Sequence, residues 1–138
     1  MDADLSTVLD LARASSDLMR RIDRPLGSDH GVSLNDLRLL LALQASPNGR
    51  LRRVELAERL GITPSGVARQ LGPLERIGVV DRERHATDAR LALAVLTKAG
   101  DALATNGART AADVAHTALG AWTDDDRATC AALLAKLG

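Results

Sequence analysis

The sequence contains almost no aromatic residues: Trp122 is the sole aromatic among 138 residues, and there is no Phe and no Tyr. The core must therefore be built from Leu, Val, Ile and Ala. Because these side chains pack well between helices, we expect an α-rich fold. The same lack argues against proteins that read single-stranded nucleic acid by stacking bases on Phe or Tyr.

Cysteine and long apolar runs are also scarce. Cys130 is the only cysteine, which excludes an internal disulfide and a cysteine-rich zinc site and suits a reducing cytoplasm. Because Ala131, Ala132 and Leu133 follow it, we expect a buried, unreactive thiol rather than an oxidant sensor. No apolar stretch approaches the ~20 residues of a membrane span, and the acidic, amphipathic residues 1–17 are unlike a secretory signal. We therefore expect a cytoplasmic protein without membrane contact.

The sequence carries no pattern typical of catalysis or metal binding. His30, His85 and His116 are far apart and lack neighbouring ligand types. Residues 124–126 are three consecutive aspartates, which suit the first turn of a helix better than a calcium loop. A nucleophile elbow, a glycine-rich phosphate loop and a His/carboxylate cluster are all missing. We predict no metal, no cofactor and no enzymatic activity.

Charge is balanced overall but unevenly distributed. The chain has 18 basic and 18 acidic residues. Residues 50–90 contain nine arginines and six acidic residues, whereas the segments on either side are slightly acidic. A polyanion would therefore bind the middle third, although an excess of three charges is weak evidence by itself.

Apolar spacing and breaker residues predict the secondary structure. Expected helices cover residues 5–23, 34–45, 53–60, 64–77, 98–119 and a final segment from 124, with Arg-Pro-Leu-Gly at 24–27 ending the first. Between the fourth and fifth helices the period changes to 2, which predicts a β-hairpin with strands at 79–84 and 90–96. Leu91, Leu93 and Val95 share one face of the returning strand.

The segment from 53 to 77 is typical of a helix-turn-helix. Gly61 ends one short helix, Thr63 caps the next, and Pro64 takes its first position. A β-hairpin follows at once. The order of elements is that of a winged helix-turn-helix. The predicted fold is therefore mainly α with a small β-hairpin wing.

The helix at 64–77 has two unlike faces. At 100° per residue, the apolar face should pack on the two preceding helices, while the opposite face is small and basic. Small residues there would let the helix enter the ~12 Å major groove, where arginine can reach guanine or phosphate. Its N-terminal amides also suit a phosphate. The apolar face consists of Val67, Leu71, Leu74 and Gly78, and the basic face of Ser65, Arg69, Gly72 and Arg76.

The hairpin predicts a second contact. Asp88 and Arg90 straddle the turn on one side of the returning strand, so the carboxylate can hold the guanidinium. Arg90 could then enter the narrow, strongly negative minor groove. Arg82 and Arg84 on the outgoing strand could contact phosphate. Arg90 could alternatively be an edge-strand charge that deters aggregation.

Several segments together resemble the MarR-type transcriptional regulators. They are LRRVELAERLGITPSGVARQLGPLERIGVVDR at 51–82, DAR at 88–90 and LTKAGDAL at 96–103. The resemblance implies a homodimer built from the N- and C-terminal helices, usually a repressor that reads a palindromic operator. It also implies a cleft between the dimerisation and DNA-binding parts for a small effector. We therefore divide the chain into an N-terminal dimerisation helix and loop (1–30), a winged DNA-binding domain (31–97) and C-terminal dimerisation helices (98–138).

The predicted partners are double-stranded DNA, a second copy of the chain and a candidate small-molecule effector. The alternative is a winged domain that serves protein interaction or structure without specific DNA binding, because fold alone does not give function. Arg76 and Arg84 could instead be surface ion-pair partners. Arg50, Arg52 and Arg53 could line phosphate or could form a generic exposed basic turn. Pro73 should kink or loosen its helix. The predicted DNA contacts are Thr63, Pro64, Ser65, Gly66, Arg69, Gln70, Arg76, Arg84, Asp88 and Arg90.

Overall fold

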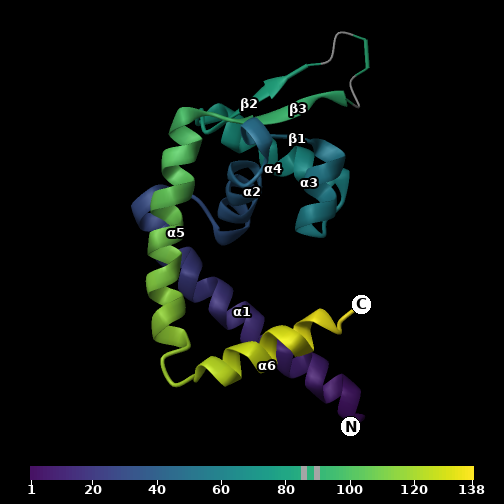
Figure 1. The fold of residues 1–138 in the computed structure, drawn as a ribbon, viewed down its shortest axis with the longest axis vertical. Helices are drawn as coiled ribbons and strands as arrows, with labels where there is room; N and C mark the ends of the chain where they lie inside the picture. Colours follow the sequence, from purple (N-terminus) through teal and green to yellow (C-terminus); the bar gives the residue numbers. More distant parts are fainter. Residues whose placement is uncertain (85–86, 89–90) are drawn as a thin grey trace.

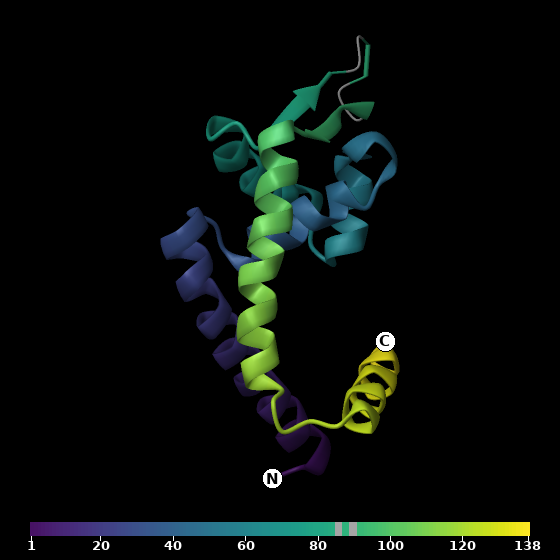
Figure 2. The same ribbon diagram turned by 60° about the vertical axis from the view of Figure 1, so that its left-hand side comes forward.

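Helices dominate the computed structural model, which describes residues 1–84, 87–88 and 91–138 (Figure 1). The sheet and the short helices form one end, and α5 leads from them to the end where α1 and α6 lie (Figure 2). This confirms the predicted fold class. None of the helices in the described ranges is long and apolar enough to cross a bilayer. The elements are α1 Ala3–His30, α2 Leu34–Gln44, a 3-10 turn Pro47–Gly49, β1 Arg50–Arg52, α3 Arg53–Leu60, α4 Pro64–Arg76, β2 Val80–Glu83, β3 Leu93–Leu96, α5 Lys98–Ala118 and α6 Asp124–Ala135.

The main core lies between α2, α3, α4 and the sheet, and α5 closes it. Its side chains are nearly all aliphatic, as the lack of aromatics predicted. Leu56 and Ala57 of α3 are buried as predicted, and Leu60 borders the same core. The main cluster consists of Val32, Leu39, Leu40, Leu43, Leu51, Leu56, Ala57, Leu60, Val67, Leu71, Leu74, Val79, Val80, Ala94 and Ala104.

The first helix is longer than the sequence predicted. It continues through Pro25 to His30, although residues 24–27 were expected to end it. Leu26, directly after the proline, is fully buried. Gly31 then adopts φ 72° and ends the helix, with its N–H bonded to the carbonyl of Gly27 at 3.0 Å. The burial of Leu26 therefore outweighs the one backbone hydrogen bond that proline removes.

The three strands have the order β1-β3-β2, and both pairs are antiparallel. Leu93 and Val95 share one side of β3, as predicted, and are half-buried; the opposite side, with Ala92 and Ala94, is the one that enters the core, and Leu91 lies before the strand at 38% exposure. Ala94 pairs with the buried Leu51 of β1. Arg82 of β2 pairs with Ala94 on its other side and therefore shares the core-facing side of the sheet. This placement brings Arg82 over the end of α4.

Small residues let α5 approach the wing and α2 closely. A Cβ on Gly100 would lie 2.0 Å from the carbonyl oxygen of Val79, and one on Gly107 would lie 3.0 Å from Leu37 Cδ1. Thr97 caps α5, and its hydroxyl also donates to the carbonyl of Gly78 at 2.7 Å. The base of the wing is thereby held against the helix that leads to α6.

Candidate nucleic-acid interface

The helix α4 begins at a capped and exposed turn. Gly61 ends α3 with φ 66°, and Thr63 Oγ1 accepts a hydrogen bond from the Gly66 N–H at 3.1 Å. Pro64 takes the first helical position, and Ser65 Oγ lies 3.1 Å from the threonine hydroxyl. These four predicted contact residues, 63–66, therefore lie together at the start of α4, where backbone N–H groups favour an anion.

The two faces of α4 lie as the sequence predicted. Val67, Leu71 and Leu74 are at most 2% exposed and pack into the core. Arg69 and Arg76 lie on the opposite face and are exposed, together with Ser65 at its start. Within the ranges that the structure describes, neither arginine has an ion-pair partner. We call Ser65, Arg69, Gly72 and Arg76 the basic strip. Its two guanidinium groups have no ion-pair partner in the described ranges, and α4 continues past Pro73 to Arg76.

Gly66 and Gly72 leave parts of the exposed surface of α4 without a side chain. A Cβ on Gly72 would meet only Arg76 Nη1, at 3.8 Å, which is ordinary contact. On Gly66 the nearest atom would be Thr63 Oγ1 at 3.3 Å. Glycine within a helix costs about 1 kcal/mol relative to alanine. Gly72 also precedes Pro73 within α4, where helical backbone disfavours a Cβ, so glycine at this position suits the helix itself as well as leaving its surface open.

Gln70 turns from α4 toward the start of α2. Its Nε2 lies 3.5 Å from Asp36 Oδ1, at the limit of hydrogen bonding. Asp36 Oδ2 also accepts the Ser33 N–H at 3.0 Å and so caps α2. A hollow of about 390 Å³ adjoins these side chains and reaches Arg69. Gln70 thus lies beside the basic strip, with its amide directed to the neighbouring helix.

The structure describes only part of the wing. Arg84 follows β2 and is exposed. Asp88 is half-buried, and its backbone carbonyl accepts the Leu91 N–H at 3.1 Å. Arg90 lies outside the described residues, together with residues 85–86 and 89. The pairing of Asp88 with Arg90 and the minor-groove contact therefore stay predictions.

Two arginines near β1 pair with carboxylates. Arg50 pairs with Glu83 across the sheet, and Arg52 Nε lies 3.0 Å from Glu55 Oε1. Hydrogen bonds from the Arg52 backbone N–H, and then from its side chain, hold the pKa of Glu55 below its usual value. Arg53 is half-buried. This region therefore has less free positive charge than its arginines suggest.

Arg82 also has a carboxylate partner, which sequence reasoning missed. Its Nη2 lies 3.1 Å from Glu75 Oε1 and 3.5 Å from Oε2, and its Nε lies 3.3 Å from Oε1. The two residues are seven apart and belong to a helix and a strand, so no local spacing rule connects them. Arg82 was expected to reach phosphate; in the free protein it joins the wing to the last turn of α4.

The remaining reactive groups form no second site in the described ranges. Cys130 is half-buried rather than buried as expected, because α6 contains no buried residue. The described part of the chain has no group of three or more His, Cys, Asp or Glu that could hold a metal ion. The candidate functional residues in the described ranges therefore lie on α4 and the wing.

Comparison with known proteins gives one family profile, described as "Winged helix-turn-helix DNA-binding", which matches residues 33–81. No curated protein has a significantly similar sequence. The matched segment begins at the cap of α2 and ends within β2. It therefore contains all of α4, including the basic strip.

Solved structures resemble the chain over nearly its full length. Sco3205, a MarR family transcriptional regulator from Streptomyces coelicolor crystallised with DNA, is 29% identical, with a TM-score of 0.86 over 97% of this chain and 85% of that one. The transcriptional regulator PA3341 is 30% identical, with a TM-score of 0.78 over 95% and 94%. The S. aureus MepR–DNA complex shares the fold at 21% identity, with a TM-score of 0.83 over 94% of each chain.

Proposed function

Because this chain belongs to the MarR family of winged helix-turn-helix transcriptional regulators, we propose that it is a homodimeric repressor that binds a palindromic operator in double-stranded DNA. The observation that carries the proposal is the basic strip of α4, whose arginines are exposed and free of carboxylate partners in the described ranges. Sco3205 and MepR, both solved with DNA, support the same partner here. Membership of this family also means that the chain is not an enzyme, as the sequence predicted.

The basic strip reads the major groove. Arg69 lies near the start of α4 and can pair with guanine O6 and N7 or with phosphate. The helix is fixed on the sugar-phosphate backbone of the DNA by Arg76 in its last turn and by the hydroxyls of Thr63 and Ser65. Gly66 and Gly72 let the helix lie deep between the two sugar-phosphate strands. Gln70 can join these contacts once its amide leaves Asp36.

The wing reads the minor groove. Asp88 orients Arg90, whose guanidinium enters the groove where the potential is most negative. Arg84, exposed at the end of β2, contacts the adjacent phosphate. Two readouts from one domain extend its recognition along the duplex, and each good base contact is worth about 1–3 kcal/mol.

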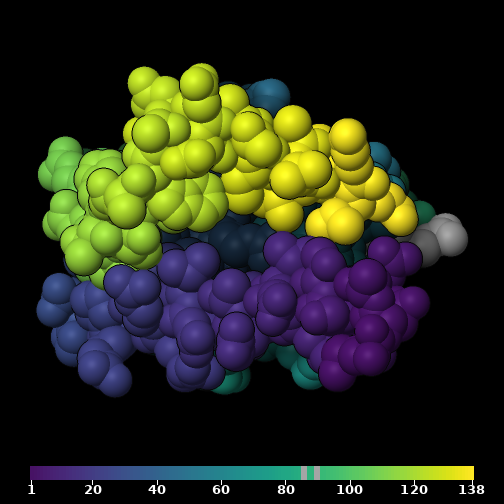
Figure 3. All heavy atoms as spheres, turned by 90° about the horizontal axis from the view of Figure 1, so that it is seen from below, coloured from purple at the N-terminus to yellow at the C-terminus, as the bar shows by residue number. Residues whose placement is uncertain are grey.

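A second copy covers the apolar surface of α1 and α6. Leu9 and Leu11 of α1 are 49% and 42% exposed, and Leu133 and Leu134 of α6 are 57% and 50% exposed. A furrow separates α1 from α6 in the view from below (Figure 3), and a hollow of about 430 Å³ there is lined by Leu11, Trp122 and α6 side chains. Apolar area of this extent on two neighbouring helices is typical of a homodimer interface.

Two-fold symmetry sets the form of the operator. Two copies of α4 related by a dimer axis would enter successive major grooves on one face of the duplex. Their half-sites would then be inverted and about one helical turn, ~10 bp, apart. A dimer seated there would block access of the transcription machinery, which is why we propose repression.

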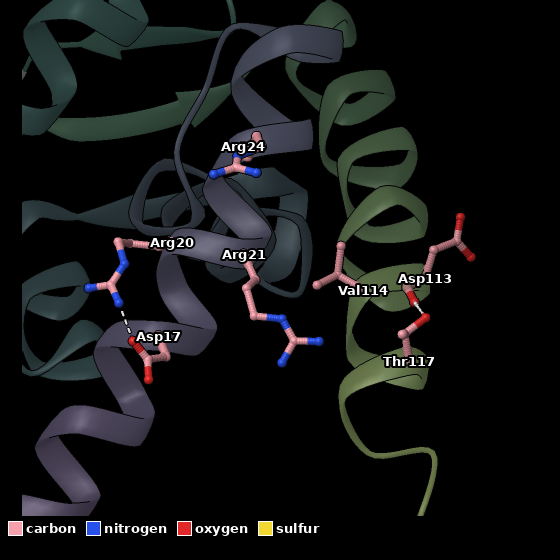
Figure 4. A pocket seen from close by; sticks show the side chains of 7 residues that line it. All are labelled: Asp17, Arg20, Arg21, Arg24, Asp113, Val114 and Thr117. Atoms are coloured by element: carbon pink, nitrogen blue, oxygen red, sulfur yellow. Dashed lines mark hydrogen bonds and ion pairs between the residues drawn. The ribbon is translucent and has the colours of Figure 1, made fainter.

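A small anionic effector binds between α1 and α5. Arg20, Arg21 and Arg24 line a hollow of about 700 Å³, with Arg21 directed toward α5 (Figure 4). Asp17 and Asp113 also line the hollow; Arg20 pairs with Asp17, whereas Arg21 and Arg24 have no carboxylate partner among the described residues. Clustered guanidinium groups favour a carboxylate ligand. The hollow lies within the helical part of the chain, away from the expected cleft beside the winged domain.

Such an effector would act through α5. That helix lines the arginine hollow near its C-terminal end and contacts Val79 near its N-terminal end through Gly100. A ligand that binds one α1–α5 spacing better than another would shift the dimer toward a spacing of the recognition helices that no longer fits the operator. Titration of the protein–operator complex with aromatic and aliphatic carboxylates tests this, with Arg21→Ala as the variant that should lose the response.

The proposed roles follow the predicted division of the chain. Residues 31–97 bind DNA, while residues 1–30 and 98–138 form the dimer. We also propose that this regulator acts in the cytoplasm.

In vitro selection from a random duplex pool tests the function directly. We expect a two-fold symmetric consensus whose affinity falls as salt rises, because phosphate contacts release counterions. Enrichment of no duplex would contradict specific DNA binding and favour a winged domain that binds protein. A consensus without symmetry would contradict the homodimeric arrangement alone.

A further inference from the structure

The base of the wing is joined to the recognition helix by one arginine–carboxylate contact. Glu75 lies in the last turn of α4, and Arg82 lies in the middle of β2. Three nitrogen–oxygen distances of 3.1 to 3.5 Å connect them, so the guanidinium presents both Nε and Nη2 to the carboxylate. The side chains of Arg82 and Glu75 are 34% and 27% exposed, which makes this contact less open to solvent than the other ion pairs that the structure describes.

The sheet register explains why Arg82 reaches the helix. Val80 is 2% exposed on the core-facing side of β2, and Arg82, two residues on, points the same way. Asp81 lies between them and is exposed on the outer side. Arg82 therefore continues the buried side of the sheet past the edge of the core, where it meets Glu75.

A carboxylate at Glu75 is unexpected on electrostatic grounds. The residue before Arg76 of the basic strip lies at the edge of the surface that would face a polyanion, where a negative charge opposes binding. A partly exposed ion pair also adds little to folding stability, because solvent screens it. Neither stability nor attraction to DNA accounts for the pair.

We propose that Glu75 and Arg82 are positioning residues that set the wing relative to α4, so that the helix and the wing fit the same duplex. The proposal rests on the DNA-binding function above. The two-nitrogen contact fixes direction as well as distance, which a single contact would not. Both the direction and the distance between α4 and the wing must be fixed if α4 is to enter the major groove while the wing enters the minor groove. The pair thereby converts two separate contacts into one recognition surface.

Glu75→Gln separates positioning from simple charge, because the two give effects of opposite sign. If Glu75 acts only as a negative charge, its removal strengthens binding to every duplex. If it positions the wing, binding to the selected operator weakens about three- to tenfold, while binding to a scrambled duplex is unchanged or tighter. Fluorescence polarisation with the two duplexes, each at two salt concentrations, gives the ratio of affinity for the operator to affinity for the scrambled duplex, which we call the operator-to-scrambled ratio.

Asp81→Asn is the matched control. It removes one negative charge from the same strand, on the outer side and away from α4, and it should leave the operator-to-scrambled ratio unchanged. If Glu75→Gln and Asp81→Asn have the same ratio, the positioning role is wrong even though the protein binds DNA. If the wild-type protein does not prefer its selected duplex at all, the proposed function fails as well.

Arg82→Lys provides a second variant that keeps the positive charge. Lysine could replace an arginine that only contacts phosphate, but it cannot present two nitrogens in one plane. We expect the operator-to-scrambled ratio to fall as it does in Glu75→Gln, with a urea unfolding midpoint close to that of the wild type. A ratio equal to that of the wild type would overturn the proposal.

Discussion

Gly100 of α5 lies directly against the backbone of Val79 at the start of the wing. A Cβ at position 100 would be 2.0 Å from the Val79 carbonyl oxygen and 2.7 Å from Leu96 Cδ1. No side chain can fit between these atoms. The glycine therefore sets how closely α5, the helix that leads toward α6, approaches the DNA-binding domain.

We predict that Gly100→Ala destabilises the protein by about 1–3 kcal/mol, because the added methyl group forces backbone apart in a packed region. Urea unfolding followed by circular dichroism measures the change. Gly27→Ala is the control: nothing lies within 4 Å of a Cβ there, and alanine suits the helix better. Equal stability of the two variants would show that the close approach is absent in solution.

Gly72 should matter more for DNA binding than for stability. Gly72→Gln adds a good helix former, but its Cβ precedes Pro73, where helical backbone disfavours a Cβ, so we expect the two effects to offset and the free energy of unfolding to change by less than about 1 kcal/mol. The same side chain projects from the basic strip and should weaken operator binding. Urea unfolding and fluorescence polarisation on one preparation test both. Tighter or unchanged DNA binding would contradict major-groove insertion of this face.

Arg69 and Arg90 should contribute separately to operator affinity. Each alanine variant should weaken specific binding by about 1–3 kcal/mol if its guanidinium contacts a base. Since one lies on α4 and the other in the wing, their effects should be nearly additive in the double variant. Fluorescence polarisation with the wild type, the two single variants and the double variant completes this double-mutant cycle. Unchanged affinity in both single variants would refute these two assignments.

Local signals in the sequence were sufficient to locate α4. Thr63 caps it, Pro64 begins it, and the period of 3.6 separates Val67 and Leu71 from Arg69; all of these are properties of a short segment. The bounds of α3 and the start of α6 followed in the same way. The basic strip was therefore predictable in place and exposure before any long-range contact was known.

Features that depend on distant residues were not predictable. α1 passes Pro25 because Leu26 is buried against elements far along the chain, and the alanine face of β3 is buried because Ala94 pairs with Leu51. The contact between Arg82 and Glu75 needs the angle between a strand and a helix. Counting charges along the sequence overstated the number of unpaired arginines, because Arg50 and Arg82 pair with carboxylates that lie on other elements.

Glu55 makes the cap of α3 sensitive to pH. Hydrogen bonds from Arg52 lower its pKa in the folded protein below the usual value of 4.5. A carboxyl with a lowered folded pKa stabilises the protein above its unfolded pKa, and this contribution is lost as the pH falls through the folded value. We expect an NMR titration midpoint for Glu55 below 4.5. In Glu55→Gln the stability difference from the wild type should shrink as acid is added; a constant difference would contradict this.

The apolar surface of α1 and α6 should hold the dimer together. Leu134→Glu places a charge on the face that we propose a second copy covers, where it would be desolvated, so we expect a monomer at micromolar concentration in light scattering. Val54→Glu is the control, since Val54 is 44% exposed on α3, away from that face, and should leave the dimer intact. The monomeric variant should keep its helical circular dichroism but bind a full operator much more weakly, because it loses the second half-site. A dimer in Leu134→Glu would place the interface elsewhere on the molecule.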